Sequence, residues 1–261
     1  MPALSATHNS GKPVKLMLIG ESGAGKTGSL VSLVKAGYKL RILDLDNGLD
    51  ALVHQVMAEC PDLIGSISYM SFRDTYKATP TGPMIQGQPK AFTGAVTALD
   101  KWEDGSKPSD WGIDTILVID SLTALGRAAF AWARNMNLAA REPRQWYNAA
   151  GTALEDVIAT ATGESFGANL IVITHIDFVE GANGIVQGFA SSIGKALGPK
   201  LPRYFNTMLA LERTGQGTQV KRIIRTVPTS LLTLKNPAPM KLGPEYPISD
   251  GLAKIFAALK S

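Results

Sequence analysis

Residues 20–27 read Gly-Glu-Ser-Gly-Ala-Gly-Lys-Thr and match the pattern G-x-x-x-x-G-K-S/T. An apolar run at residues 14–19 precedes them, and a helical stretch at residues 26–36 follows. Glycines let successive backbone N–H groups turn toward one anion, and the amino end of a helix adds partial positive charge. This order therefore predicts a loop that binds a nucleoside triphosphate, in which Lys26 neutralises the β and γ oxygens and the Thr27 hydroxyl binds Mg²⁺. The residues expected to contact the nucleotide are Gly20, Glu21, Ser22, Gly23, Ala24, Gly25, Lys26, Thr27 and Gly28.

Further apolar runs and helical stretches alternate along the chain. Continuous apolar sequence is typical of strands that are buried on both faces of a sheet. The runs lie at residues 40–45, 115–119 and 170–174, with helical stretches at residues 49–59, 91–102 and 145–162. This alternation predicts an α/β fold with a mostly parallel sheet flanked by helices. Residues 207–212, 220–226 and 231–234 indicate antiparallel C-terminal strands, the first two joined by a turn at residues 214–217.

Two segments interrupt the alternation. Residues 79–90 are rich in Pro and Gly, which predicts a loop or small insertion. Residues 181–202 are rich in Gly, Ser and Ala, which predicts a mobile surface loop that orders on a ligand.

The composition limits the possible protein classes. A chain of 261 residues fits one large domain, and we expect residues 14–261 to form it after a flexible tail at residues 1–13. Apolar residues make up 45% and charged residues 18%, which excludes a disordered protein. We find no apolar run of membrane-spanning length and no secretory signal, so we expect a cytoplasmic protein without a membrane partner. The single cysteine, Cys60, excludes an internal disulfide.

Charge is distributed unevenly along the chain. Residues 1–189 carry 15 Lys and Arg against 19 Asp and Glu, whereas residues 190–261 carry 11 against 3. The basic C-terminal extension suits a polyanion such as nucleic acid, because phosphate contacts come mainly from Lys and Arg. The alternative is a solvated face whose lysines support the nucleotide site.

Two carboxylates are candidates for the chemistry at the triphosphate. The apolar run at residues 116–119 ends in Asp120, a Walker B pattern in which the aspartate holds the Mg²⁺ shell together with Thr27. Hydrolysis also needs a group that orients the attacking water. Asp46 follows the second predicted strand, at the edge where parallel strands converge on a ligand, and is our candidate for that role. The alternative is that Asp46 or Asn47 caps the next helix.

Three segments carry a resemblance to a known family. Residues 43–50 (Leu-Asp-Leu-Asp-Asn-Gly-Leu-Asp), residues 119–125 (Ile-Asp-Ser-Leu-Thr-Ala-Leu) and residues 234–237 (Leu-Lys-Asn-Pro) resemble segments of RecA-family recombinases, in the same order. More closely, the chain resembles phage P-loop ATPases with a RecA-like core, which include RecA-like single-strand annealing proteins. The resemblance implies a RecA-like fold, ATP hydrolysis with Mg²⁺, and a homo-oligomeric ring or filament. It further implies single-stranded DNA and a single-strand binding protein as partners, in the host cytoplasm if the chain is phage-encoded.

The resemblance also assigns roles to individual residues. It places Asp50 near the adenine and Lys235 at a neighbouring subunit's nucleotide. Arg222 and Arg225 are further candidates for reaching the neighbour, on charge and position alone. His175 stands where the family usually has a glutamine that senses the γ-phosphate; the alternative is a histidine that satisfies backbone groups at a strand end. The chain departs from the family at Asp46, where the family has the longer glutamate, and at Pro237, which replaces a second lysine.

Two segments, residues 135–147 and residues 176–202, resemble in position the DNA-binding loops of RecA-like cores. Basic residues stand beside aromatic rings at residues 135–147, an arrangement used by proteins that bind single strands. The alternative is that Trp146 and Tyr147 begin the following helix as core residues. The DNA-binding candidates are Arg141, Arg144, Trp146, Lys195, Lys200 and Arg203.

Two other functions remain open from the sequence. A P-loop enzyme acting on a small molecule, such as a nucleotide kinase, needs an arginine-bearing lid, and residues 141–144 (Arg-Glu-Pro-Arg) are the candidate segment. Residues 174–177 (Thr-His-Ile-Asp) distantly resemble the guanine-reading motif of GTP-dependent switches. Asp120 is, however, followed by Ser-Leu-Thr and lacks the glycine that such a switch uses.

Overall fold

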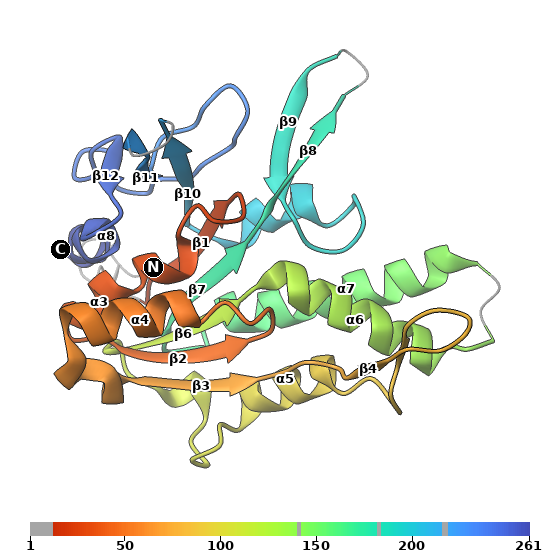
Figure 1. The fold of residues 1–261 in the computed structure, drawn as a ribbon. Helices are drawn as coiled ribbons and strands as arrows, with labels where there is room; N and C mark the ends of the chain where they lie inside the picture. Colours follow the sequence, from red (N-terminus) through yellow and green to blue (C-terminus); the bar gives the residue numbers. More distant parts are fainter. Residues whose placement is uncertain (1–12, 140–141, 182–183, 216–218) are drawn as a thin grey trace, which may run out of the picture.

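A sheet of eight strands forms the centre of the computed structural model, and helices cover both of its faces (Figure 1). The structure describes residues 13–139, 142–181, 184–215 and 219–261. In order across the sheet, the strands are β12 (Glu245–Pro247), β11 (Lys221–Arg225), β10 (Thr207–Thr214), β1 (Lys15–Gly20), β7 (Asn169–Thr174), β6 (Thr115–Asp120), β2 (Lys39–Asp44) and β3 (Ile67–Ser71). Strands from β10 to β3 pair in parallel, whereas β11 and β12 continue the sheet antiparallel. The predicted fold class, an α/β fold with a mostly parallel sheet and antiparallel C-terminal strands, is confirmed.

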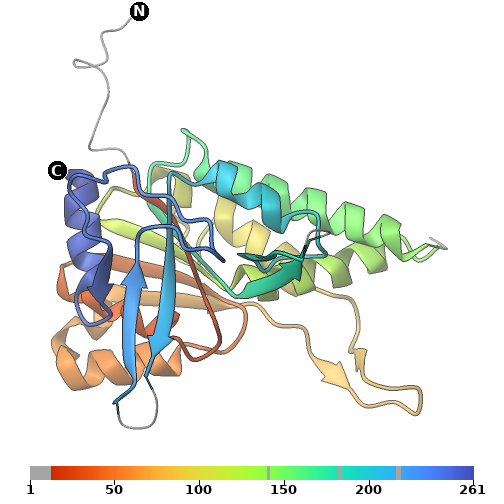
Figure 2. The ribbon, with the colours of Figure 1, turned by 90° about the horizontal axis from the view of Figure 1, so that it is seen from above.

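Side chains of each buried strand alternate between two layers of helices. One layer holds α5 (Ala91–Asp100), α6 (Leu122–Met136) and α7 (Pro143–Thr162), and the other holds α3 (Val31–Lys35), α4 (Asp50–Glu59) and α8 (Gly251–Lys260) (Figure 2). In β1, Met17 and Ile19 belong to the first core, while Leu16 and Leu18 belong to the second. Because both faces of the sheet are covered, the strands contain continuous rather than alternating apolar sequence.

The helices differ from the prediction at two places. The stretch at residues 26–36 forms two short helices, α2 (Lys26–Ser29) and α3, which are interrupted at Leu30. The helix α6, directly after β6, was not predicted. Its amino end is capped by Ser121, whose side chain accepts a hydrogen bond from the backbone N–H of Ala124. Short 3₁₀ helices lie at η1 (Pro61–Ser66), η2 (Pro108–Asp110) and η3 (Gly198–Tyr204).

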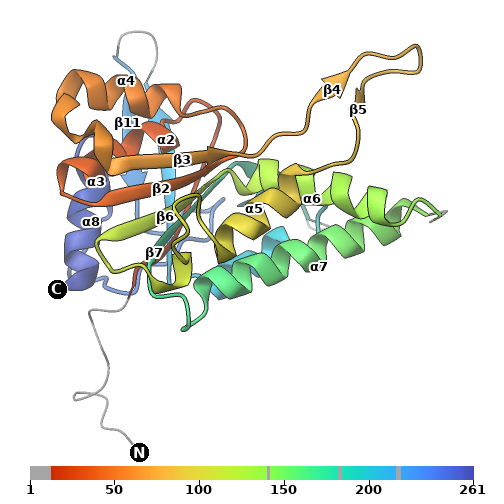
Figure 3. The same ribbon diagram turned by 90° about the horizontal axis from the view of Figure 1, so that it is seen from below.

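The two interrupting segments each contain a hairpin. Residues 79–90, predicted as a loop or small insertion, include β5 (Met84–Ile85), which pairs with β4 (Tyr76–Lys77) in an arm that extends from the body (Figure 3). Residues 181–202, predicted as a mobile loop, include β9 (Val186–Ala190), which pairs with β8 (Ile176–Glu180), and the start of η3. Both segments therefore hold regular structure that their glycine and proline content did not predict.

The prediction of a strand at residues 231–234 is wrong. Leu232 and Leu234 are buried, but the pairing here consists of isolated bridges, one between Leu232 and Gly188 and one between Lys235 and Met208. The edge position beside β11 belongs to β12. The predicted tail and the predicted turn at residues 214–217 fall largely on residues 1–12 and 216–218, which lie outside the described residues.

Within the described part of the chain, none of the helices combines the length and the apolar character that crossing a lipid bilayer requires.

Candidate active site

The phosphate-binding loop joins β1 to α2. Gly23 and Gly25 adopt left-handed backbone conformations, with φ of 74° and 96°, which glycine adopts without strain. A Cβ on Gly25 would also lie 2.6 Å from Cδ1 of Ile248, so that side chain would have to move to make room for it. The loop therefore keeps its shape only with these glycines.

Lys26 is almost fully buried beneath this loop. Its Nζ donates hydrogen bonds to the carbonyl oxygens of Gly20, at 2.8 Å, and Glu21, at 2.9 Å. Burial lowers the pKa of Lys26, while the negative charges of Asp120 and Asp46 oppose that shift. The Lys26 ammonium group can bind phosphate oxygens once it releases the carbonyl oxygens of Gly20 and Glu21.

Asp120 lies at the carboxyl end of β6 and is 2% exposed. Its Oδ2 accepts a hydrogen bond of 2.6 Å from the Thr27 hydroxyl. Burial raises the pKa of Asp120 to about 7, and the Thr27 hydrogen bond partly offsets this. A hydroxyl and a carboxylate at this spacing form a donor set that suits Mg²⁺, which binds few protein oxygens and completes its shell with phosphates and water.

Asp46 lies beyond the carboxyl end of β2. Its Oδ2 accepts a hydrogen bond of 2.8 Å from the Ser121 hydroxyl. The amino end of α4 has no side-chain cap, so the alternative that Asp46 or Asn47 caps this helix is not what the structure shows. The Asp46 carboxylate instead faces the same space as Lys26 and Asp120.

The turn that carries Asp46 is held by a buried carboxylate that sequence reasoning missed. Asp44 accepts hydrogen bonds from the Asn47 backbone N–H, at 3.1 Å, and from the Ser71 hydroxyl, at 3.0 Å, and forms an ion pair with Arg73. Arg73 also donates to the side-chain oxygen of Asn47, at 2.7 Å. These contacts fix the backbone on both sides of Asp46.

His175 follows β7 and is half-buried. Its Nδ1 lies 3.3 Å from the Thr123 hydroxyl, which also accepts a hydrogen bond from the His175 backbone N–H. Burial lowers the pKa of His175, and the positive charge of Lys26 lowers it further, so the ring is neutral near neutral pH. A neutral imidazole can donate one hydrogen bond to an anion. Thr123 was another residue that the sequence did not single out.

These side chains surround one cleft. It has a volume of about 280 Å³ and lies at the carboxyl edge of the sheet. The cleft brings together the predicted Lys26, Thr27, Asp46, Asp120 and His175, and small residues complete its wall. The lining residues are Ser22, Gly23, Gly25, Lys26, Thr27, Gly28, Asp46, Gly48, Ala51, Asp120 and His175. Asp50, expected near the adenine, begins α4 beside Ala51 but does not line the cleft.

The residues expected to reach a neighbouring subunit have contacts within the chain. The Arg222 Nε lies 3.4 Å from the Gly23 carbonyl oxygen, on the chain's own phosphate loop. Arg225 forms two contacts of 2.8 Å with Glu212, which raise its pKa. The Lys235 Nζ donates to the carbonyl oxygens of Pro202, at 2.9 Å, and Phe205, at 2.6 Å.

The DNA-binding candidates lie on separate elements. Arg144 and Trp146 belong to the first turns of α7, where Trp146 donates a hydrogen bond of 2.8 Å to the Asn137 carbonyl and packs edge-to-face on Phe130. Lys200 lies on η3, and its Nζ is 3.8 Å from Oε2 of Glu155 on α7. Lys195, Lys200 and Arg203 are exposed, and Arg141 lies outside the described residues.

One protein-family model and two solved structures are similar to this chain. A protein-family model described as an AAA domain matches residues 12–238. A search of curated proteins finds no match. Among solved structures, the KaiC-like protein PH0186 from Pyrococcus horikoshii OT3 is similar at 14% identity, with 84% of this chain and 86% of that chain covered and a TM-score of 0.40. The flagellar accessory protein FlaH from Methanocaldococcus jannaschii is similar at 10% identity, with 95% and 93% covered and a TM-score of 0.45.

Proposed function

The chain belongs to the AAA domain family and is a P-loop NTPase domain, and from this premise we propose that it hydrolyses ATP with Mg²⁺ while assembled on single-stranded DNA. The observation that carries the ATPase part is the cleft of about 280 Å³ that Lys26, Thr27, Asp46, Asp120 and His175 share. Each of these side chains has the chemistry that one part of phosphoryl transfer needs.

The phosphate loop binds the triphosphate. Backbone N–H groups of residues 23–27 and the amino end of α2 attract the phosphate oxygens. Lys26 exchanges its two carbonyl partners for the β and γ oxygens, which bear more negative charge. Thr27 and Asp120 hold Mg²⁺, which when bound neutralises charge on the same oxygens.

Asp46 orients the attacking water. Ser121 fixes the direction of its carboxylate, and the Asp44–Arg73 ion pair fixes the turn that carries it. The water oxygen attacks the γ-phosphorus, its proton leaves toward Asp46, and the bond to the β–γ bridging oxygen breaks to release ADP and phosphate. His175 lines the same cleft and donates a hydrogen bond to the γ-phosphate. Because its ring is neutral, it can do so without repelling the positive charge of Lys26.

Single-stranded DNA is the proposed polymer partner, and annealing or strand exchange the proposed outcome. Support comes from the basic extension at residues 190–261 and from the exposed cations Arg144, Lys195, Lys200 and Arg203. A homo-oligomer would place several such surfaces along one strand. We keep Lys235 and Arg225 as candidates for contacts between subunits, although each would first have to leave its partners within the chain.

The test measures ATP turnover and the ATP-dependent binding of a labelled oligonucleotide at low salt, where binding driven by charge is strongest. We expect Lys26→Ala to abolish ATP turnover and the nucleotide dependence of DNA binding. The matched control is Lys107→Ala, which removes the same charge from an exposed position near the amino-terminal edge of the sheet. A parent protein that binds no oligonucleotide in the presence of ATP would rule out the DNA part of the proposal.

A further inference from the structure

A second cavity, of about 300 Å³, lies at the carboxyl edge of the sheet beside the nucleotide cleft. Asp46 lines both cavities, and the other residues around the second one do not reach the first. One wall is the chain directly after β3, from Phe72 to Tyr76, and the opposite wall is α6, through Arg127. This cavity is therefore a separate space that shares one carboxylate with the proposed ATP site.

Two guanidinium groups and two carboxylates line the cavity, and one of the carboxylates, Asp46, already accepts a hydrogen bond from Ser121. Arg127 is exposed, and within the described residues no hydrogen bond or ion pair engages it. Arg73 is 40% exposed, and its contacts with Asp44 and Asn47 leave part of its fork of five donors available. Asp74 also lines the wall, but its carboxylate accepts hydrogen bonds from two backbone N–H groups at the start of α5. An anion, and a phosphate in particular, matches the two arginines.

The remaining walls are aromatic or small and apolar. Phe72 packs over Gly94, where a Cβ would lie 2.8 Å from its ring, so the ring has a fixed place. Tyr76 is the first residue of β4 in the β4–β5 arm, and 59% of it is exposed. Ala124 and Ala128 of α6 line the same cavity, and their side chains are small. A flat ring is the group that stacks on such a wall.

We propose that this cavity binds one nucleotide unit, with its phosphate at Arg73 and Arg127 and its base against Phe72 and Tyr76. A volume of about 300 Å³ lies at the lower end of the range for ligand sites, about 300–1,000 Å³, and suits one such unit. The unit belongs either to a free nucleoside monophosphate or to a single strand of DNA. The inference rests on the proposed function, because the cavity shares Asp46 with the proposed ATP site.

The experiment first saturates the protein with a non-hydrolysable ATP analogue and Mg²⁺, so that the phosphate loop is filled. Calorimetry then measures the binding of dTMP and of deoxyribose 5-phosphate, which lacks the base, and fluorescence anisotropy measures the binding of a labelled oligothymidylate. The variants are Arg127→Ala and Tyr76→Ala, with Lys107→Ala as the control for loss of one positive charge. Thermal unfolding of each variant establishes that it is folded. Arg73 is left intact because it also supports the turn that carries Asp46.

We expect Arg127→Ala to weaken binding by about tenfold or more, the change expected for one lost charge-assisted hydrogen bond. Tyr76→Ala should weaken binding of dTMP or the oligonucleotide but not of deoxyribose 5-phosphate, because the base is what stacks on the ring. If dTMP binds, the ligand is a free nucleotide, as a phosphotransferase acting on a small molecule would require. If only the oligonucleotide binds, the ligand is a strand.

Two results would overturn the inference. One is that a parent protein binds the oligonucleotide, or dTMP, with an affinity that neither Arg127→Ala nor Tyr76→Ala changes relative to Lys107→Ala. The other is that neither ligand binds at all. The first result leaves the proposed ATPase on DNA intact and removes only this site. The second result removes this site together with the DNA part of the proposed function. The ATPase part fails only in a different measurement, namely ATP turnover that is insensitive to Lys26→Ala.

Discussion

The carboxylate of Asp46 accepts a hydrogen bond of 2.8 Å from the Ser121 hydroxyl. Asn at this position keeps the size of the side chain and one acceptor oxygen, but removes the negative charge that attracts the proton of a water. We expect Asp46→Asn to bind a non-hydrolysable ATP analogue as tightly as the parent and to hydrolyse ATP about 10² times more slowly or worse. Phosphate release and a fluorescent nucleotide titration measure the two quantities.

Asp62→Asn is the control for this change, because Asp62 is an exposed carboxylate on the 3₁₀ helix η1, away from the cleft. It should leave both quantities unchanged. Normal hydrolysis by Asp46→Asn would mean that another group orients the water, and Asp44 would then be the next carboxylate to test, since it lies at the end of the same strand.

At the scale of single residues, the sequence predicts those site residues that lie together in one short motif. Gly25, Lys26 and Thr27 are adjacent, and their roles follow from the spacing of the motif. The contact between Asp44 and Arg73 could not be predicted in this way. It exists because β2 and β3 pair in parallel with Asp44 opposite Ser71, which brings the residues after both strands to one place. The same holds for Ser121 and Asp46, which lie 75 positions apart.

Two helical glycines show how α6 and α7 hold the segment that follows the β8–β9 hairpin. A Cβ on Gly126 of α6 would lie 2.6 Å from the carbonyl oxygen of Ser192, a backbone atom that has little freedom to move. A Cβ on Gly151 of α7 would lie 3.9 Å from the Ile193 side chain, an ordinary contact. Only the first glycine is required by packing.

We expect opposite effects from the same substitution at these two positions. Gly151→Ala should raise the free energy of unfolding by about 0.5–1 kcal/mol, because alanine favours the helix. Gly126→Ala should lower it by about 1–3 kcal/mol, because the added methyl group forces apart two packed backbones. Urea unfolding followed by circular dichroism measures both. Stabilisation by Gly126→Ala would show that residues 191–193 can move away from α6.

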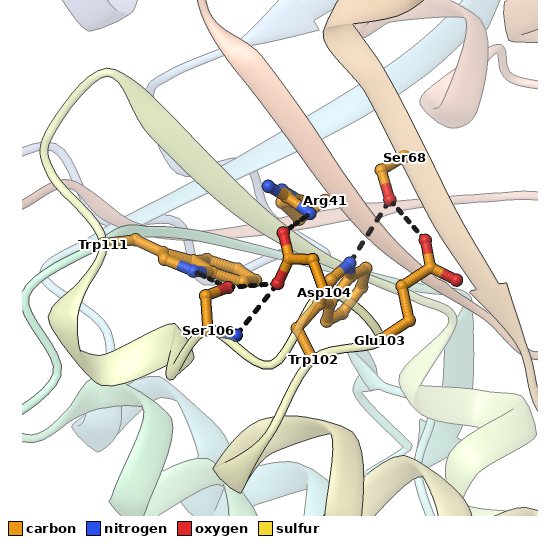
Figure 4. A network of polar contacts seen from close by, with 7 residues as sticks. All are labelled: Arg41, Ser68, Trp102, Glu103, Asp104, Ser106 and Trp111. Carbon is orange, nitrogen blue, oxygen red and sulfur yellow. Dashed lines mark hydrogen bonds and ion pairs between the residues drawn. The ribbon is translucent and has the colours of Figure 1, made fainter.

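The loop between α5 and β6 is joined to the sheet by a polar and aromatic network (Figure 4). Asp104 accepts hydrogen bonds from the hydroxyl and the backbone N–H of Ser106, at 2.6 and 2.9 Å, and pairs with Arg41 of β2 at 2.8 Å. The Arg41 guanidinium in turn lies over the rings of Trp102 and Trp111. The hydrogen bonds from Ser106, and then Arg41, lower the pKa of Asp104 to about 2.

This shift predicts how the loop contributes to stability at acid pH. The folded state holds the charged form of Asp104 more strongly than the unfolded state does, so the contribution is present above about pH 4 and is lost as the pH falls toward 2. We expect the parent to be more stable than Asp104→Asn at pH 5, with the difference shrinking between pH 4 and pH 2. Unfolding curves of both proteins across this range measure the difference. A difference that stays constant would mean that the carboxylate charge is not what holds the loop.

At the scale of elements, continuous apolar runs predicted the buried strands correctly, whereas the helix α6 and the hairpins in the interrupting segments were missed. The four central strands were predicted to within a residue or two, because burial on both faces leaves an uninterrupted apolar run. The strand predicted at residues 231–234 is wrong because Leu232 and Leu234 are apolar for another reason. Both side chains pack into the core formed with α5–α7, while the backbone pairs only through isolated bridges. An apolar pattern indicates that side chains are buried, but it does not indicate that their backbone pairs with a neighbouring strand.

The order of strands across the whole sheet determines which distant residues reach the nucleotide. β1 lies between β7 and β10, so the phosphate loop meets both His175 and the antiparallel C-terminal strands. Arg213 of β10 lies directly opposite Arg222 of β11, and like charges in that arrangement destabilise a pair of strands. A bound triphosphate beside Arg222 would offset this repulsion. The topology therefore favours Arg222 as a ligand of the chain's own nucleotide, whereas the sequence analysis made it a candidate for reaching a neighbour's nucleotide.

Mixing two impaired variants tests whether Arg222 contacts the nucleotide of its own chain or that of a neighbour. We expect Arg222→Ala alone to lower ATP turnover by about tenfold or more, as loss of a donor to the transferred phosphate does. If Arg222 acts on its own chain, a mixture of Arg222→Ala with Lys26→Ala shows only the sum of the two separate activities. The reason is that neither protein then has a site containing both residues. Steady-state phosphate release over a range of mixing ratios gives the measurement.

Lys235→Ala mixed with Lys26→Ala is the matched comparison, because Lys235 is the residue that the family resemblance places at a neighbour's nucleotide. The Lys235 mixture could show activity above the sum of its two variants while the Arg222 mixture shows only the sum. That result would mean that Arg222 serves the site on its own chain and Lys235 serves the site on a neighbouring subunit. Recovery of activity in the Arg222 mixture would contradict a role on its own chain. It would mean that the contact of Arg222 with Gly23 gives way, on assembly, to a contact with the adjoining subunit's triphosphate.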